Sequence, residues 1–340
     1  MFYKKPLLLS NDFASKSMPL CHLRQLIDMG IHITPSEVNI NVFDFTDFEG
    51  SFSLWECFSA SLFQFMSRLD SRFNIELVLW ENVPLDTNLL RAWLDPLIKH
   101  GIEVTNCKIR YSSSLGFVPS RNTEPFNDYK IIEDTGAMSV ENLHLNFFGP
   151  SEICRQLSPQ KPCINLDSIQ YLDLSFNQLT DMDLRSIQFP KALKELNLSN
   201  NSISVFDSES LPFETLSELK ILDLSNNNIM RLDICSPRDQ ICSSVQVLNL
   251  SGNFLSTYSP LFGGPLFSGL QEIDLSHNLI SQLSGFTESL KRVNLTGNYI
   301  TKQPEPSALC FSKNLEVLGI DRFLVDALYE TENTQPSCKA

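Results

Sequence analysis

Reactive residue types are scattered along this sequence rather than gathered into a recognised catalytic or metal-binding motif. The nine cysteines include two closest pairs, Cys154/Cys163 and Cys235/Cys242, and neither has a second pair at the spacing of a zinc finger. No two of the five histidines are close in sequence, and there is no glycine-rich phosphate loop, no H-E-x-x-H and no C-x-x-C. We therefore predict no catalytic residues, no metal site and no cofactor, in a protein that is not an enzyme.

A different chemistry, the binding of a protein surface, suits a group of aromatic and charged residues between positions 80 and 176. Trp, Tyr and Arg dominate the energetics of protein interfaces. The candidate partner-binding residues are Trp80, Arg110, Tyr111, His144, Phe147, Tyr171, Asp173 and Phe176. The alternative for Phe147 and Phe176 is that both rings turn inward to pack in the core. The group can act together only if the fold brings its members to one face.

An internal repeat predicts the elements that would position them. The pattern L-x-x-L-x-L-x-x-N-x-L occurs six times between residues 169 and 300, beginning at Ile169, Leu193, Leu219, Val245, Leu270 and Leu290. The alternation L-x-L predicts a short strand with one buried face, and the asparagine predicts a bend that its side chain can bond. A single turn cannot bury its leucines, so the copies must stack. A seventh copy at 315–325 has Phe323 in the asparagine place and resembles a closing repeat.

This pattern resembles the leucine-rich repeat. The resemblance implies an α/β fold, a curved horseshoe-shaped solenoid with a parallel β-sheet on the concave face and helices, then loops or 3₁₀ turns, on the convex face. Weaker copies begin at Ile40, Asn74, Val104 and Val140, at steps of 34, 30, 36 and 29 residues, so this half resembles the longer, helix-bearing repeats of the ribonuclease-inhibitor type. Their expected core positions are Phe43/Phe45, Leu77/Leu79, Cys107/Ile109 and Leu143/Leu145.

The repeats divide the chain into three parts. Residues 1–39 are expected to form an N-terminal helical cap, residues 40–325 a solenoid of about 11 repeats that is irregular before 169, and residues 326–340 a polar tail. Capping residues Ser53 and Asp86 begin two expected convex-face helices. Three irregular segments, at 112–139, 232–244 and 256–269, are expected to be surface loops that connect turns or add contacts.

Two columns of side chains are expected on the concave face. The central column comprises Asp44, Val78, Lys108, His144, Asp173, Asn197, Asp223, Asn249, Asp274, Asn294 and Gly319. The next comprises Thr46, Trp80, Arg110, Asn146, Ser175, Ser199, Ser225, Ser251, Ser276, Thr296 and Asp321. A solvated strand face needs no function, so the Asp–Asn–Ser part has a purely structural explanation. The aromatic part is the candidate site.

Composition restricts the class of partner. The 340 residues carry 26 Lys and Arg against 40 Asp and Glu, a formal net charge of −14. This charge argues against a nucleic-acid binder and against a protein held on an acidic membrane, and no apolar run approaches the roughly 18 residues of a membrane span. An odd number of cysteines, without a recognisable signal peptide, favours free thiols in a reducing compartment.

These observations favour a monomeric, non-enzymatic protein–protein interaction scaffold that binds a partner with a basic patch through its concave face. The chain also resembles the leucine-rich-repeat effectors of intracellular bacterial pathogens, which implies a virulence function, a host protein as partner and secretion into the host cytoplasm by a type IV-like system. The polar segment 329–340 resembles the export signals of that system. The alternatives are a cytoplasmic eukaryotic regulator or adaptor, an enzyme with its site in 1–39 or 112–139, and a receptor ectodomain with Cys310 and Cys338 in its flank.

Overall fold

The computed structural model describes four N-terminal strands and most of the repeat region. The described residues are 31–33, 37–42, 72–80, 104–112, 138–148, 150, 153, 157, 164–207, 210–213, 215–233, 244–256, 269–281, 289–300 and 314–321. Within them no helix has the length and apolar character needed to cross a membrane. The segment Leu20–Met29 of the expected cap, the expected helices beginning at Ser53 and Asp86, and the tail 326–340 lie outside the described residues.

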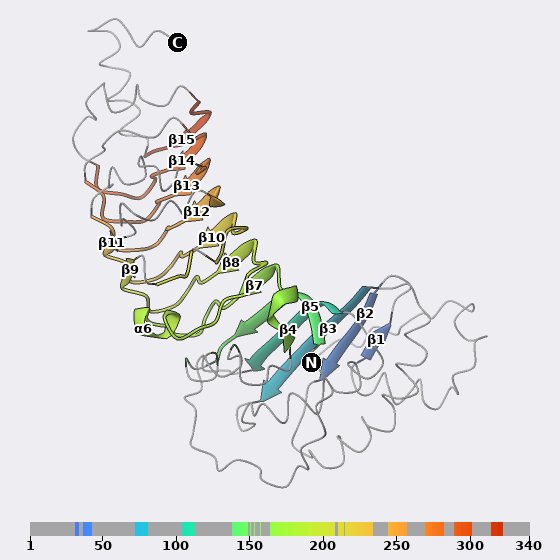
Figure 1. Cartoon of the computed structure of the whole chain (residues 1–340). Coiled ribbons are helices and arrows are strands. Elements are labelled where there is room, and N and C mark those ends of the chain that lie inside the picture. The colour runs from blue at the N-terminus through green and yellow to red at the C-terminus, as the bar shows by residue number, and fades with distance from the viewer. Residues whose placement is uncertain are drawn as a thin grey trace, which may run out of the picture.

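One 13-stranded sheet runs through the whole described chain (Figure 1). Its strands are β1 (Ile31–Ile33), β2 (Glu37–Val42), β3 (Arg72–Trp80), β4 (Val104–Ser112), β5 (Met138–Asn146), β6 (Ile164–Asn165), β7 (Tyr171–Asp173), β8 (Glu195–Asn197), β10 (Ile221–Asp223), β12 (Val247–Asn249), β13 (Glu272–Asp274), β14 (Arg292–Asn294) and β15 (Val317–Gly319). From β2 onward neighbouring strands are parallel, and β1 pairs with β2 antiparallel. The stacked parallel strands confirm the leucine-rich-repeat solenoid.

The strands shorten abruptly after β5. Strands β3, β4 and β5 have nine residues each, whereas those from β7 onward have three. A second, two-stranded parallel sheet of β9 (Val205–Asp207) and β11 (Arg231–Asp233) lies on the opposite side of the turns from β8 and β10 (Figure 1). The sequence did not predict these two strands. Helix is scarce in the described residues, which contain α6 (Asp181–Leu184) and the 3₁₀ turn η1 (Leu166–Ser168).

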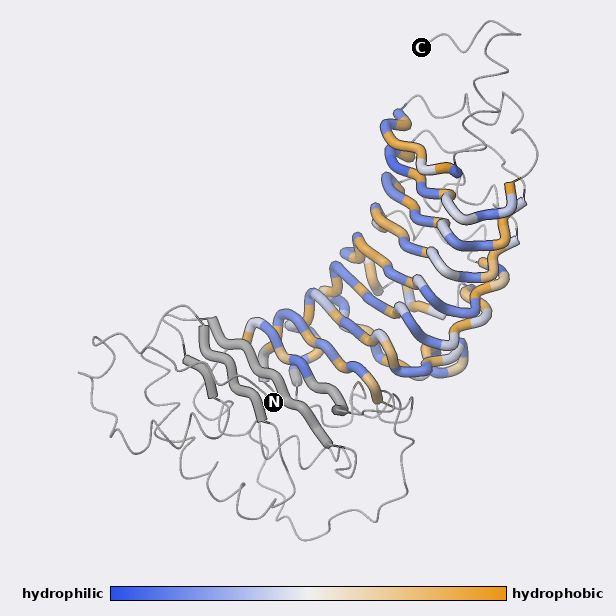
Figure 2. The backbone as a smooth tube through the Cα atoms, turned by 180° about the vertical axis from the view of Figure 1, so that it is seen from behind, coloured by the Kyte–Doolittle hydropathy of each residue, from blue (hydrophilic) through white to orange (hydrophobic). Residues whose placement is uncertain are grey.

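The core is a set of apolar columns inside the turns. Hydrophobic segments recur at the same place in successive turns (Figure 2), as the repeat pattern predicts. In β7, β8 and β10 the middle residue is buried and its neighbours are half-exposed, so Leu172, Leu196 and Leu222 are at most 2% exposed. Each coil therefore buries its leucines only against the coils before and after it.

A ladder of buried asparagines closes each bend, as the sequence predicts. Asn227 donates from Nδ2 to the carbonyls of Leu198 (2.9 Å) and Leu224 (3.0 Å), and its Oδ1 accepts from Ile203 N (3.1 Å). Asn177, Asn201, Asn253, Asn278 and Asn298 repeat the two carbonyl bonds in their own turns. The side chain replaces main-chain pairs that the tight bend cannot make.

Two of the sequence-derived registers are wrong. Ile75 of β3 lies opposite Cys107, and Leu77 lies opposite Ile109, so the expected pair Leu77/Leu79 is displaced by two residues. In β2, Ile40 and Val42 occupy the places expected for Phe43 and Phe45. The central column therefore contains Glu76, which lies opposite Lys108, and not Val78.

The N-terminal boundary contains strand as well. Strand β1 and the start of β2 lie inside the segment 1–39 that was expected to form a helical cap. Among the cysteines, Cys107 is described. It is a free thiol with no exposed surface, and burial raises its pKa to about 12. This thiol is a structural core residue that is unreactive at neutral pH.

Candidate functional site

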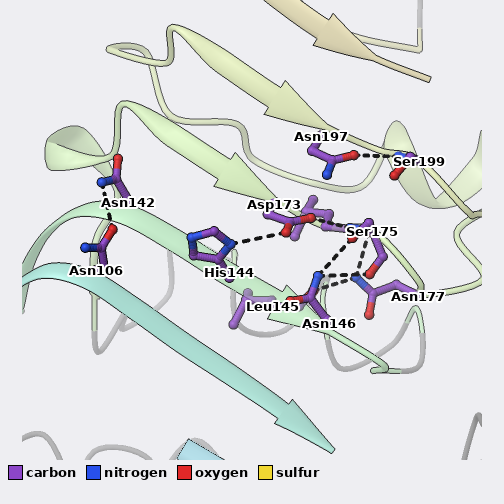
Figure 3. Close-up of polar contacts among 11 residues, drawn as sticks. Asn106, Asn142, His144, Leu145, Asn146, Asp173, Ser175, Asn177, Asn197 and Ser199 are labelled. Atoms are coloured by element: carbon purple, nitrogen blue, oxygen red, sulfur yellow. Dashed lines mark hydrogen bonds and ion pairs between the residues drawn. The ribbon is translucent and has the colours of Figure 1, made fainter. Parts of the chain in front are cut away.

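The junction between the long strand β5 and the short strand β7 brings three candidate residues together. His144 lies opposite Asp173 in the sheet, and Nδ1 of the imidazole is 3.1 Å from Oδ2 of the carboxylate (Figure 3). The rings of His144 and Tyr171 are tilted against each other with centroids 5.0 Å apart. These three side chains form one half of what we call the junction cluster, defined as His144, Phe147, Tyr171, Asp173 and Phe176.

Hydrogen bonds and burial shift the pKa values of two members of the junction cluster, Asp173 and Tyr171. Burial alone would raise the pKa of Asp173, but hydrogen bonds from His144 and Ser175 outweigh it and hold that pKa below its ordinary value. Burial and the neighbouring Asp173 charge both raise the pKa of Tyr171. The site therefore presents a carboxylate beside a neutral phenol, a combination suited to a cationic partner group.

The other half of the junction cluster is a stacked phenylalanine pair in a left-handed bend. Phe147 and Phe176 have φ of 66° and 61°, and their rings stack with centroids 5.2 Å apart. Later turns place Asn200, Asn226, Gly252, His277 and Gly297 at the equivalent position, also at positive φ. Asn and Gly tolerate this conformation, whereas a bulky side chain costs about 1–2 kcal/mol there.

Side-chain contacts hold this bend in place. Asn146 donates from Nδ2 to the backbone oxygen (3.2 Å) and Oγ (3.1 Å) of Ser175 (Figure 3). The N–H of Phe147 donates to Phe176 O at 3.1 Å, whereas the N–H of Phe176 donates to the carbonyl of Ser199 in the next turn. The stacked pair is thus set by main-chain bonds and does not depend on ring contacts alone.

The inward alternative for the phenylalanines is wrong for Phe176, whose side chain is 46% exposed. Phe147 is half-buried, and the core position beneath the bend is filled by Phe148, which has no exposed surface. The backbone N–H of Phe148 donates to Asn177 Oδ1 at 2.7 Å, so the first short turn is bonded to the last long one. At the junction the apolar core is therefore continuous through Phe148, and Phe176 adds an aromatic ring to the surface.

For the remaining candidates, Trp80, Arg110 and Tyr111, the structure gives the position in the sheet through the backbone register. Arg110 and Tyr111 lie in β4, and Arg110 is opposite Asn146. Trp80 ends β3 and is opposite Ser112, so it does not share a column with Arg110, contrary to the sequence interpretation. Val78 takes that place. The side chains of Trp80, Arg110 and Tyr111 lie outside what the structure describes.

Sequence reasoning overlooked the column to which Tyr171 belongs. In register with Tyr171 stand Glu195, Ile221, Val247 and Glu272, all half-buried on the concave face. The first residue of each short strand could have been read as a third column from the same alternation. This column adds two apolar residues to an otherwise polar face.

Catalysis finds little support in the described residues. No group of three His, Cys, Asp or Glu side chains in them is placed to hold a metal ion. His144 and Asp173 form a pair of the kind that activates nucleophiles, but Ser175 Oγ contacts Asn146 and the aspartate and is not bonded to the imidazole. A nucleophile must hydrogen-bond its base, so this arrangement is not a catalytic triad.

Part of the repeat region is similar to a known protein family. Residues 167–229 match the family model described as leucine rich repeat. Among solved structures, the chain is similar to a Shigella effector LRR domain, at 19% identity and a TM-score of 0.27, covering 44% of this chain and 70% of that one. It is also similar to a chain of the LRIM1/APL1C complex, at 17% identity and a TM-score of 0.38, covering 78% of this chain and about half (48%) of that one. No curated protein sequence matches.

Proposed function

We propose that this leucine-rich-repeat protein is a non-enzymatic scaffold that binds a protein partner through its concave face, with the junction cluster as the anchor. Repeats of this family typically form protein-interaction scaffolds. The observation that carries the proposal is the stacked pair Phe147/Phe176 in a left-handed bend, with Phe147 half-buried and Phe176 46% exposed. Strained, bulky residues persist where the surroundings enforce them, and such sites are commonly functional.

The partner's chemistry follows from the cluster and from the whole chain. Aromatic rings beside the ionised Asp173 favour Arg or Lys side chains, which can lie on a ring face and pair with a carboxylate. A net charge of −14 attracts a basic surface over longer distances. We therefore expect a basic patch on the partner.

A pull-down with matched variants tests this proposal. The bait variant is Tyr171→Ala/Phe176→Ala, and the control is Phe254→Ala/Tyr299→Ala, which removes two exposed aromatics (46% and 63% exposed) from distant turns. Both variants must retain the circular dichroism of the wild type. A protein held by wild type and control but lost by the junction variant supports the proposal, whereas one held equally by all three overturns it.

The narrower proposal is that the partner is a host protein and the chain a secreted bacterial effector. It is supported by composition, with 24 phenylalanines and repeats rich in Asn and Ser. A translocation reporter fused to the chain distinguishes it from a eukaryotic regulator: delivery into host cells that requires a type IV system supports the effector, and failure of delivery contradicts it. The monomeric state stays a prediction, which light scattering would check.

A further inference from the structure

We propose that the concave face takes a polyproline II segment carrying Lys or Arg at every third residue. This inference rests on the proposed function, because it names the partner segment that the same face would bind. It follows from a regular spacing of carboxylates, from their remaining capacity to accept hydrogen bonds, and from the aromatic rings at one end of the row.

Carboxylates occur on alternate strands of the central column. Asp173, Asn197, Asp223, Asn249 and Asp274 lie opposite one another in β7, β8, β10, β12 and β13. Strands in a sheet are 4.7–4.9 Å apart, so successive aspartates repeat at about 9.5 Å along the solenoid. The intervening asparagines keep like charges from lying directly opposite each other.

Each aspartate keeps part of its acceptor capacity. Asp173 accepts at Oδ1 from Ser175 N (2.9 Å), and its Oδ2 is paired with His144 Nδ1 (3.1 Å). Asp223 accepts at Oδ1 from Ser225 N (2.8 Å) and at Oδ2 from Asn249 Nδ2 (3.2 Å). Asp274 accepts from Ser276 N, Ser276 Oγ and Asn294 Nδ2. A carboxylate offers about four acceptor positions. The partners of Asp223 and Asp274 are neutral, and in the described part of the chain no Lys or Arg forms an ion pair with either aspartate.

The 9.5 Å repeat selects one backbone conformation for the ligand. In polyproline II, residues i and i+3 lie on the same side and about 9.3 Å apart. An extended β-strand places same-side residues about 6.7 or 13.4 Å apart, and an α-helix about 10.5 Å apart at i and i+7. Over the two intervals from Asp173 to Asp274 the mismatch is about 0.4 Å for polyproline II and about 2 Å for the helix.

Aromatic and apolar residues complete the surface. His144 is paired with Asp173 at one end of the row (Figure 3), and its ring is tilted against that of Tyr171 with centroids 5.0 Å apart. Polyproline II segments dock on aromatic surfaces. Ile221 and Val247 lie beside the row, two residues before the central column.

Two peptides of equal composition test the repeat. One has proline in two of every three places and arginine in the third. The other contains the same residues with its arginines at every second position. Titration of the whole chain, followed by fluorescence anisotropy, should give at least about tenfold tighter binding of the first, since three favourable pairs of modest strength sum to that ratio.

A charge-neutral swap provides the matched variant. Asp223→Asn/Asn249→Asp leaves the net charge at −14, and each new side chain keeps the Oδ1 that accepts the serine N–H of its turn. It moves the middle carboxylate by one strand. We expect the preference for the first peptide to disappear while binding of both remains weakened by salt.

Three outcomes overturn the inference: equal affinity of the two peptides for the wild type, an unchanged preference in the swap variant, or no binding of either peptide. None of them decides the proposed function. That function is tested separately, by whether a protein partner requires Tyr171 and Phe176.

Discussion

Each asparagine of the buried ladder bonds backbone groups of two adjacent turns, and the leucine carbonyls between successive asparagines accept from both of them. Asn227 is 3% exposed and bonds two carbonyls and one N–H across two adjacent turns. A buried polar group left without its partner costs about 1–3 kcal/mol. The ladder residue therefore stabilises two turns at once.

We expect Asn227→Ala to lower the free energy of unfolding by about 1–3 kcal/mol. The N–H of Ile203 loses its buried acceptor, whereas the carbonyls of Leu198 and Leu224 each lose one of two donors and keep Asn201 and Asn253. The neighbouring Asn228→Ala is the control, since Asn228 is exposed and surface changes cost about 0.5 kcal/mol or less. Urea denaturation followed by circular dichroism measures both. Equal stabilities of the two variants would show that the ladder contributes nothing.

Phe176 provides a test that separates binding from stability. Phe176→Asn inserts the residue type that occupies the same left-handed position in the next two turns, at Asn200 and Asn226. Relief of about 1–2 kcal/mol of backbone strain offsets about 0.5–1.5 kcal/mol of lost ring stacking. The free energy of unfolding should thus stay within about 1 kcal/mol of wild type, while partner affinity falls about tenfold or more. A loss of stability with unchanged affinity would make Phe176 a packing residue.

At the scale of elements, α6 is bonded to the following turn by one carboxylate. Asp181 accepts from the N–H groups of Ser204 (2.7 Å) and Val205 (3.0 Å) and from Ser204 Oγ (2.8 Å). Burial alone would raise the pKa of Asp181, but these hydrogen bonds outweigh it and lower that pKa. The bonds fix the start of β9 against the helix.

This arrangement predicts a pH-dependent contribution to stability. The pKa of Asp181 is lower in the folded than in the unfolded protein, so its ionised carboxylate stabilises the fold. This stabilisation is fully present above the unfolded-state pKa of about 3.9, and it is lost as the pH falls through the folded-state pKa. Asp181→Asn should cost on the order of 1 kcal/mol at pH 7 and almost nothing in strong acid. Urea titrations of both proteins across this range measure the difference. A constant difference at all pH values would exclude the carboxylate's charge as the cause.

The elements also show what the sequence could and could not predict. From Ile169 onward, the pattern L-x-x-L-x-L-x-x-N allows only one pairing register between neighbouring strands. The structure confirms that register. In β3 the places Ile75, Leu77 and Leu79 are all apolar with the same alternation, so a shift by two residues cannot be recognised. In addition, Asn82 fits the shifted register, whereas the asparagine place of the observed register is occupied by Trp80.

The candidate site was predicted only where the repeat pattern sets the register of the strands. From Lys108 to Gly319 the observed central column is the one that the sequence predicts. The alternation of apolar and polar residues was therefore enough to predict that His144 lies opposite Asp173. The sequence named Phe147 and Phe176 as candidates but did not predict their left-handed conformation, because phenylalanine disfavours it and nothing local indicates it.

At the scale of the whole molecule, the charge of −14 should accelerate association with a basic partner. We expect the association rate constant to fall at least about tenfold between low and high salt, as screening shortens to a few ångström. The Phe176→Asn variant should change mainly the dissociation rate, because short-range contacts act after encounter. Surface plasmon resonance at several salt concentrations measures both rates. Salt-independent association would contradict a basic partner surface.

The most direct test of the central claim is site-specific photocrosslinking. A photoreactive phenylalanine analogue replaces either Phe176 or Phe254, which are equally exposed at 46% but lie three turns apart. Crosslinked products from cells are then identified by mass spectrometry. The proposed anchor predicts a partner crosslinked through position 176 and absent, or far weaker, at position 254. A partner captured at 254 and not at 176 would contradict it and move the binding surface away from the junction cluster.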